Sequence, residues 1–225
     1  MQKNRKLIIV GDSAFAEIAY EYFVNDSEYD VVAFSVEQTY LKRDSLFGIP
    51  IVPFESLGRF YDIATHEVFV AVVYTKLNRL RTRLMKSAKQ KGYKLASFIS
   101  PHAFVWKNVK MEEHCFIFEN NVVQPFVQLG NNVILWSGNH IGHHSVIQDN
   151  NFISSHVVIS GYAEIGENSF LGVNATVTNN VKIGKDNWIG PGVTISKDTK
   201  PGALYGPYQT EPSRVTALRF FDVED

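Results

Sequence analysis

A six-residue rhythm of large aliphatic side chains runs through the second half of the chain. From Ile99 to Ile195 every sixth residue is Ile, Leu, Val or Met, through seventeen consecutive hexads without a slip. Chance would produce such a run on the order of once in 10^10, given the ordinary frequency of these residues. The pattern predicts a repeat architecture in which every unit buries one side chain at the same place.

Two other positions of the hexad are restricted as well. The fifth holds only small or medium-sized residues, such as Ala103, Cys115 and Ser145. The fourth is Asn, Asp or Gly in eleven of the seventeen hexads, and these residues tolerate the left-handed backbone angles of a turn. A large inward side chain, a small neighbour and a turn every six residues describe a triangular solenoid. Three hexads form one coil, so residues eighteen apart stack at ~4.8 Å.

Short apolar runs alternate with helical patterns in the first hundred residues. Strands are expected at 6–10, 31–34 and 51–52 and within the apolar run 67–74, with helices at 14–23 and 76–91. Gly92 supplies the stop signal of the second helix. This alternation implies a small parallel sheet with covered faces.

The first strand leads through Gly11, Asp12 and Ser13 into the first helix. A helix N-terminus offers free N–H groups and the positive end of a dipole, so this turn could cradle a phosphate. The turn lacks the second and third glycines of a dinucleotide fingerprint. A purely structural connection is an equally good interpretation of it.

Composition narrows the class of protein. The 225 residues are 45% apolar and 20% charged, and the formal net charge of −1 provides no electrostatic footprint for nucleic acid or for a membrane surface. No segment approaches the ~20 apolar residues of a membrane helix, and the N-terminal apolar stretch is too short for a signal peptide. Cys115 is the only cysteine, which excludes disulfides and thiolate metal cages. A cytoplasmic enzyme or binding protein is expected.

Histidine provides the candidate chemistry, because its ordinary pKa of ~6.5 suits a general base near neutral pH. The third slot of a hexad points outward, and His143 occupies it. Gly161 follows eighteen residues later, so it stacks directly beside His143 and exposes a backbone N–H where an oxyanion could form. The histidines of the fourth slot are interpreted first as polar turn residues: His102, His114, His144 and His156.

The order of an α/β unit, the segment Ile99-Ser100-Pro101-His102-Ala103 and the hexads resembles the hexapeptide-repeat sugar acetyltransferases. Those enzymes include the bacillosamine and perosamine N-acetyltransferases and the NeuD-like proteins. The resemblance covers the chain to about residue 200. It implies an α/β, Rossmann-like half domain over residues 1–98, a left-handed parallel β-helix over 99–200 and a tail over 201–225.

The resemblance also implies the function and the site. It implies an N-acetyltransferase that uses acetyl-CoA, without a metal, to acetylate a nucleotide-linked amino sugar (of the 4-amino-4,6-dideoxy type) for surface polysaccharide or glycan biosynthesis. His143 corresponds to the general base, Gly161 to the glycine that meets the acetyl carbonyl, and His144 to the residue that helps to orient the base or the acceptor. Coenzyme A would follow the column of Gly161, Asn179 and Lys197, and Gly11, Asp12 and Ser13 would meet the nucleotide phosphates. The expected assembly is a homotrimer with active sites between neighbouring prisms.

Three alternatives remain open at this point. The first is O-acetylation of a sialic-acid-like sugar, and the second is a zinc enzyme of the β-helix carbonic anhydrase kind, although the histidines lack that family's paired spacing. The third is a scaffold without catalytic activity, since fold does not imply function. The identity of the nucleotide, the accepting position on the sugar and the role of the tail are not determined by the sequence.

Overall fold

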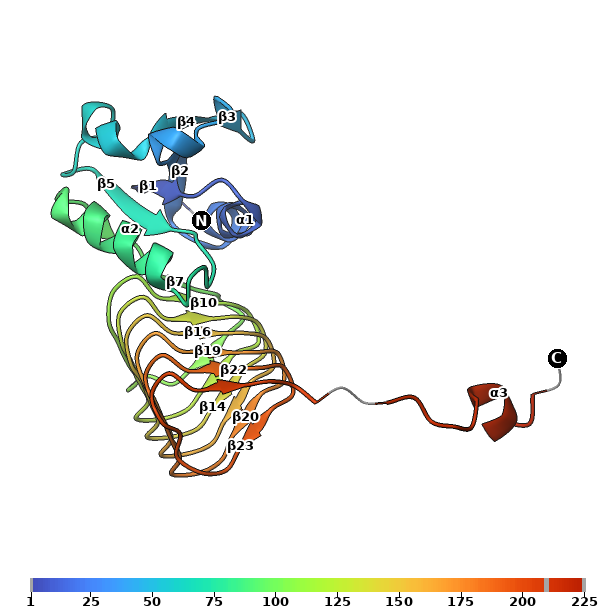
Figure 1. The fold of residues 1–225 in the computed structure, drawn as a ribbon. Helices are drawn as coiled ribbons and strands as arrows, with labels where there is room; N and C mark the ends of the chain where they lie inside the picture. The colour runs from blue at the N-terminus through green and yellow to red at the C-terminus, as the bar shows by residue number, and fades with distance from the viewer. Residues whose placement is uncertain (1, 209–210, 224–225) are drawn as a thin grey trace.

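A computed structural model describes residues 2–208 and 211–223 of the chain. It contains an α/β domain that lies against one side of a long three-sided prism, with the C-terminal segment extending away from both (Figure 1). The elements of the α/β domain are β1 Arg5–Val10, α1 Ala14–Asp26, β2 Tyr29–Val36, η1 Gln38–Tyr40, β3 Ser45–Leu46, β4 Ile49–Pro53, η2 Phe54–Arg59, β5 His66–Val70, α2 Arg79–Gln90 and β6 Lys94–Leu95.

The strands of this domain form one sheet in the order β3-β4-β2-β1-β5-β6. All neighbours are parallel except β3 and β4, which form an antiparallel pair. Alternate residues of β1 face opposite sides: Leu7 and Ile9 join the core on the α1 side, while Ile8 and Val10 join the core on the α2 side. The predicted parallel sheet with two covered faces is therefore confirmed.

One predicted boundary is wrong. Helical spacing places the start of the second helix at Lys76, but α2 begins at Arg79. Lys76, Leu77 and Asn78 adopt left-handed backbone angles instead, with φ of 51°, 49° and 67°. The other end is as expected, since Gly92 follows α2 with φ of 95°.

The prism consists of three parallel sheets, which are called here the first, second and third faces. The first face contains β7 Phe98–Ile99, β10 Phe116–Ile117, β13 Ile134–Leu135, β16 Phe152–Ile153, β19 Phe170–Leu171, β22 Trp188–Ile189 and β24 Leu204–Tyr205. The second contains β8 Phe104–Val105, β11 Val122–Val123, β14 His140–Ile141, β17 Val158–Ile159, β20 Thr176–Val177 and β23 Thr194–Ile195. The third contains β9 Lys110–Met111, β12 Gln128–Leu129, β15 Val146–Ile147, β18 Glu164–Ile165 and β21 Lys182–Ile183.

Register along the prism follows the predicted period of eighteen. Ile117 pairs with Leu135, and Leu135 pairs with Ile153. The inward aliphatic side chains are buried from Ile117 onward, but Ile99 is 42% exposed because it belongs to the first coil, beyond which no further coil stacks. The expectation that every sixth side chain is buried is therefore wrong at the N-terminal end of the prism.

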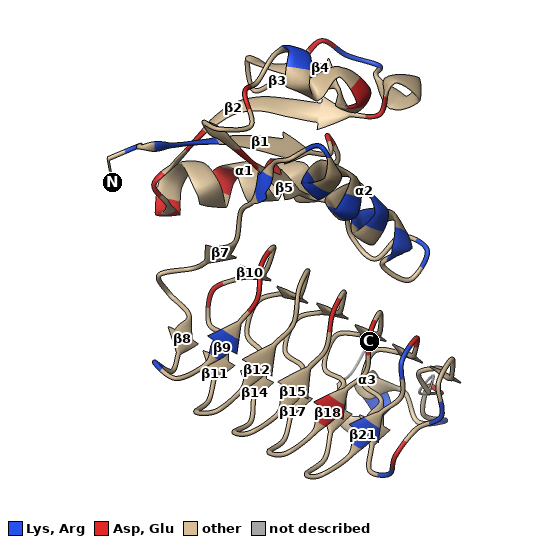
Figure 2. Cartoon of the chain, turned by 90° about the vertical axis from the view of Figure 1, so that its left-hand side faces the viewer, with Lys and Arg blue, Asp and Glu red and all other residues tan. Residues whose placement is uncertain are grey.

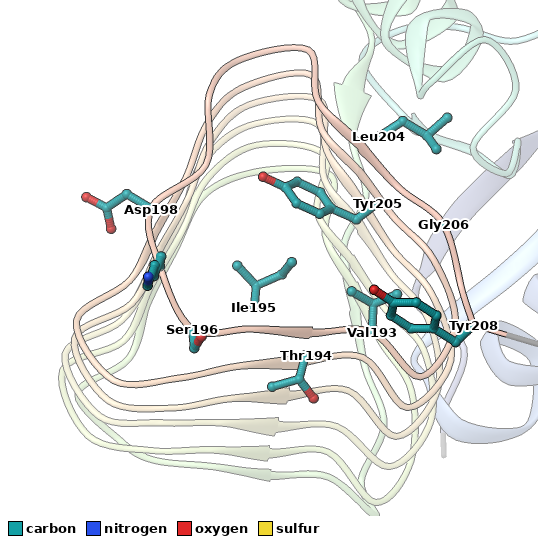
Figure 3. Close-up of a pocket in the computed structure, with 10 residues that line it drawn as sticks. Val193, Thr194, Ile195, Ser196, Asp198, Leu204, Tyr205, Gly206 and Tyr208 are labelled. Carbon is teal, nitrogen blue, oxygen red and sulfur yellow. The ribbon is translucent and has the colours of Figure 1, made fainter.

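The prism is left-handed, as the resemblance implies. Figure 3 looks along it from the C-terminal end, and the last coil runs clockwise from Val193 past Ser196 and Asp198 to Tyr205. Every fourth-slot residue from His114 to Gly192 has a positive φ, which confirms the predicted turn position for that part of the repeat. Asn108, also in a fourth slot, does not have a left-handed φ.

The first face carries the α/β domain. Phe15 and Phe23 of α1 pack against Phe98 and Phe116 of the first face, with ring centroids 5.4–5.9 Å apart in the pairs Phe15–Phe116, Phe23–Phe98 and Phe23–Phe116. Lys and Arg residues occur along α2, beside the corner between the third and first faces (Figure 2). In the tail, the short helix α3 Ala217–Phe220 and all of residues 211–223 are exposed.

Candidate active site

The corner between the second and third faces, called here the His143 corner, brings His143 and Gly161 together. The exposed His143 ring lies over Gly161, as the eighteen-residue spacing predicts. A Cβ on Gly161 would meet His143 Cε1 at 2.8 Å and Nε2 at 2.9 Å. Only glycine leaves room for the imidazole to lie this close to the next coil, so the ring packs directly on the backbone of Gly161.

Gly161 is buried beneath the His143 ring, and its backbone N–H is the candidate oxyanion donor. Among the described residues it donates no hydrogen bond, although the neighbouring N–H groups of Ser160 and Tyr162 donate to Val177 and His143 carbonyls. A Cβ on Gly142, one coil earlier, would lie 2.5 Å from the Gly161 nitrogen. Glycine at 142 therefore allows the two coils to approach closely at this amide, a requirement that sequence reasoning missed because the contact is made only by stacked coils.

His144 lies beside His143 and is held in an aromatic stack. The two Nδ1 atoms are 3.1 Å apart, so one ring donates a hydrogen bond to the other. The His144 ring stacks between Phe126, at 4.6 Å, and Tyr162, at 4.7 Å. The His143 backbone N–H donates to Gln124 Oε1 at 2.9 Å. The contacts of Phe126, Tyr162 and Gln124 with the two histidines were not predicted from the sequence. They are made between neighbouring coils, and no local sequence pattern indicates them.

Asn179 and Lys197 continue the same column toward the C-terminal end. Asn179 lies one coil beyond Gly161, as the hydrogen bond from Asn180 N to Gly161 O shows, and Lys197 follows β23 at the last coil. Both side chains are exposed. Lys197 lines a cavity of about 450 Å³ at the end of the prism, together with Ile195 and Tyr205 (Figure 3). The column provides an open strip along the corner rather than an enclosed pocket.

A second cleft lies at the carboxyl edge of the α/β sheet. It has a volume of about 240 Å³, and its lining includes Gly11, Asp12, Ser13 and the loop after β5. Gly11 has φ of 126°, and a Cβ there would lie 2.8 Å from Ala71 O, so the close approach of two strands requires glycine. Ser13 is the N-cap of α1, yet its side chain makes no capping hydrogen bond. The Ala16 N–H donates to the Ser13 carbonyl at 2.7 Å, whereas the N–H groups of Ala14 and Phe15 donate no hydrogen bond among the described residues.

Two arginines stand at this cleft. Arg43 Nε bonds Asp12 Oδ2 at 3.3 Å, and Arg83 makes a bidentate pair with Glu37 at 2.8 Å for each bond. The hydrogen bonds from Arg83 lower the pKa of Glu37. The carboxyl edge of a parallel sheet with a helix N-terminus beside it is the usual place for a phosphorylated ligand.

The cleft and the His143 corner lie on different sides of the chain. The α/β domain covers the first face, whereas His143 projects from the corner where the other two faces meet. In Figure 3 this corner, at Ser196, is opposite the side on which the α/β domain lies. A single chain therefore brings His143, His144 and Gly161 together but keeps Gly11, Asp12 and Ser13 away from them.

Comparison with a family model covers the part of the prism that holds this corner. Residues 126–161 match the model described as bacterial transferase hexapeptide (six repeats). The matched segment begins at Phe126 of the aromatic stack and ends at Gly161. Over these residues the chain is similar to the repeat that the model describes.

Solved structures share the architecture of this hexapeptide-repeat chain over most of its length. The acetyltransferase domain of PglB from Neisseria gonorrhoeae FA1090 has 23% sequence identity and a TM-score of 0.81, over 93% of this chain and 100% of that chain. The same domain has been solved in complex with acetyl coenzyme A. PerB from Caulobacter crescentus, in complex with CoA and GDP-perosamine, has 22% identity and a TM-score of 0.78, over 90% of this chain and 94% of that chain. Among curated proteins the comparison finds no match.

Two other histidines of the hexapeptide repeat, His156 and His114, pack against neighbouring parts of the chain. His156 packs on Gly138, where a Cβ would lie 2.6 Å from its ring. His114 is fully buried at the junction with the α/β domain, so its interpretation as an ordinary polar turn residue is incomplete. In residues 2–208 and 211–223 no group of three or more His, Cys, Asp or Glu side chains could hold a metal ion. No helix of that part of the chain is long and apolar enough to cross a membrane.

Proposed function

We propose that the protein is an acetyl-CoA-dependent N-acetyltransferase that acetylates the amino group of a nucleotide-linked sugar, of the 4-amino-4,6-dideoxy type, in the cytoplasm for surface polysaccharide or glycan biosynthesis. The observation that carries the proposal is the His143 imidazole over the Gly161 amide. A base and an oxyanion donor at one position are what acetyl transfer to an amine requires. The fold shared with the PglB acetyltransferase domain and with PerB supports the same class of reaction.

In the proposed reaction the amine nitrogen of the sugar forms a bond to the thioester carbonyl carbon. His143 Nε2 accepts the proton that the nitrogen loses, and the Gly161 N–H donates a hydrogen bond to the oxygen that gains negative charge. When the C–S bond breaks, the proton passes from His143 to the departing thiolate, so the base returns to its first state. His144 accepts the Nδ1–H of His143, which leaves His143 Nε2 unprotonated and facing the reacting atoms.

The two substrates would be held by different parts of the molecule. The pantetheine arm of acetyl-CoA follows the strip from Gly161 past Asn179, and Lys197 meets its phosphates. The nucleotide phosphates bind at Gly11, Asp12 and Ser13, where the N-terminal amides of α1 provide donors. Because this cleft lies away from the His143 corner of the same chain, a neighbouring copy completes the site, and the assembly is a homotrimer with three equivalent sites.

The test is the His143→Ala variant, assayed by free thiol release with acetyl-CoA and a panel of UDP-, GDP- and dTDP-linked amino sugars. Turnover should fall ~10²–10⁴-fold because the proton acceptor is lost. His156→Ala is the matched control, since it removes a ring that also packs on a glycine but at another corner. Equal turnover in the two variants would disprove the role of His143. A wild-type protein that released thiol only with hydroxyl acceptors would instead be an O-acetyltransferase.

A further inference from the structure

The loop between β5 and α2, residues 71–78, has an unusual backbone. Three consecutive residues that are not glycine, Lys76, Leu77 and Asn78, have positive φ. Residues other than glycine are disfavoured in this conformation, because the Cβ atom comes too close to the following carbonyl oxygen. A conformation of this kind persists only where surrounding contacts determine it, and such segments often occur at functional sites.

A buried arginine, Arg81, forms hydrogen bonds with this loop and with the prism. Arg81 is 0% exposed and forms no ion pair within the described residues. Its guanidinium donates to the loop carbonyls of Val72, at 3.3 Å, and Val73, at 3.4 Å. It also donates to the prism, at 2.8 Å to Asn132 Oδ1 and at 3.3 Å to the carbonyls of Asn132 and Asn151. Burial lowers the pKa of Arg81 to about 9, so the side chain keeps its charge at neutral pH.

Two further residues attach the loop to the first face of the prism. Asn78 Nδ2 donates to the carbonyl of Ser169 at 3.1 Å. The Tyr74 ring packs on Phe170, at 4.4 Å, and on Phe152, at 5.2 Å. The prism therefore contacts the loop directly at Tyr74 and Asn78, and through Arg81 near the beginning of the loop.

The same loop forms a wall of the cleft in the α/β domain. Val72, Val73 and Thr75 line this cleft opposite Gly11 and Ser13. The two carbonyls that Arg81 fixes thus belong to residues of the cleft wall. Arg81 itself is buried, so it acts on the cleft only through the loop.

We propose that the prism sets the shape of the nucleotide cleft, with Arg81 as a positioning residue that holds the β5–α2 loop in its strained conformation. The inference rests on the proposed function, because it assigns the cleft to a nucleoside diphosphate group. Binding of the nucleotide then depends on the junction between the two domains, whereas binding of acetyl-CoA at the far corner does not. Displacement of a binding wall by about 1 Å is enough to reduce activity by orders of magnitude.

The experiment measures nucleotide affinity and acetyl-CoA kinetics on the same variants. Calorimetric titration with UDP, GDP and dTDP first identifies the tightest nucleotide for the wild type. Arg81→Lys retains the charge but loses the planar fork, and Tyr74→Ala removes the ring that anchors the loop. In both variants the dissociation constant of that nucleotide should rise about tenfold or more, while the KM for acetyl-CoA changes less than about twofold. Tyr74→Phe, which keeps the ring, should bind as the wild type does.

Trp188→Ala is the matched control. Trp188 also stacks on Phe170, at 5.9 Å, but it does not line the cleft. It should lower stability without changing the affinity for the nucleotide. Circular dichroism identifies any variant that fails to fold, and Tyr74→Ala, at a side chain that is 45% exposed, tests the proposal if Arg81→Lys does not fold.

Three outcomes would overturn the inference. One is unchanged nucleotide affinity in Tyr74→Ala or in folded Arg81→Lys. Another is an equal loss for nucleotide and acetyl-CoA, which would indicate general structural damage. The last is a wild-type protein that acetylates amines but binds none of the three nucleotides, a result that would leave the transferase activity intact and remove the role of the cleft.

Discussion

The fourth slot of the hexad has a positive φ throughout the middle of the prism, and most of its occupants are Asn, Asp or Gly. At the His143 corner the occupants are instead Phe126, His144 and Tyr162, with φ of 67°, 60° and 59°. Large side chains are disfavoured there by steric contacts. The turn itself does not require aromatic residues. Three aromatic rings on consecutive coils, at the corner that holds the candidate base, therefore suggest that the stack serves the site.

Exchange of residues between two corners tests this interpretation. Asn174→Tyr, at an exposed turn of another corner, should lower the free energy of unfolding by about 1 kcal/mol and leave kcat unchanged. Tyr162→Asn relieves the backbone but loses the stack on His144 and the edge contact with His143, so its stability should stay within about 1 kcal/mol of the wild type while kcat falls. Urea unfolding and steady-state kinetics provide both quantities. A Tyr162→Asn variant with the kcat of the wild type would show that the stack contributes only to packing.

Gly161 gives a second prediction at the scale of a single residue. Gly161→Ala places a methyl group within 2.8 Å of the His143 ring, so the ring must move away from the Gly161 amide. We expect kcat/KM for acetyl-CoA to fall by about 10²-fold, because the displaced imidazole no longer lies in line with the reacting atoms. Gly58→Ala, where an added Cβ meets nothing within 4 Å, is the control. Unchanged kinetics in Gly161→Ala would place the reaction elsewhere.

Among the elements, β5 depends most directly on the prism. The Val70 N–H donates to His114 Nε2 at 2.8 Å, and His114 Nδ1 donates to Asn132 Oδ1 at 2.9 Å. The bond from Val70 requires a neutral imidazole, because a protonated Nε2 cannot accept, and burial lowers the pKa of His114 to about 3. Asn132 Oδ1 also accepts from Arg81, so one amide oxygen connects the strand, the helix α2 and the prism.

This geometry predicts a specific dependence of stability on pH. The unfolded chain protonates His114 near pH 6.5, whereas the folded chain does not protonate it until about pH 3. Between these values the unfolded state binds the additional proton, so stability falls as pH falls, by ~1.4 kcal/mol per unit from this residue. Urea midpoints between pH 7 and 5 should decline less steeply in His114→Gln than in the wild type. Parallel curves would show that His114 is protonated in the fold.

For the whole molecule, the separation of cleft and His143 corner predicts complementation between copies. Ser13→Glu adds a negative charge at the helix N-terminus where phosphate would bind, and His143→Ala removes the base. Each variant alone should be inactive with a nucleotide-linked acceptor. Trimers assembled from an equal mixture should recover roughly a quarter of wild-type activity, because a site is complete only when one copy supplies the cleft and its neighbour supplies the histidine. Light scattering verifies the trimer, and absence of recovery would mean that each chain forms its own site.

The sequence predicts the prism well because each coil contacts only its neighbours, and a fixed period therefore records the whole architecture. The column of His143 and Gly161 follows from the same period. The left-handed turn at Lys76, by contrast, lies between contacts to residues far away in the sequence, because Asn78 donates to the Ser169 carbonyl and Arg81 donates to the Asn132 and Asn151 carbonyls. Gly142 could not be identified because its role appears only when one coil lies on the next, and the burial of His114 results from a domain that packs over it.

The eighteen-residue register also limits how this protein can change in length. A single inserted residue within a strand would turn every later aliphatic side chain of that coil toward solvent, so small insertions are tolerable only where they bulge from a corner. An insertion of eighteen residues that keeps the hexad pattern would instead add one complete coil and move Lys197 ~4.8 Å farther from His143. The distance between His143 and Lys197, which a ligand along this corner would span, can therefore change only in steps of one whole coil.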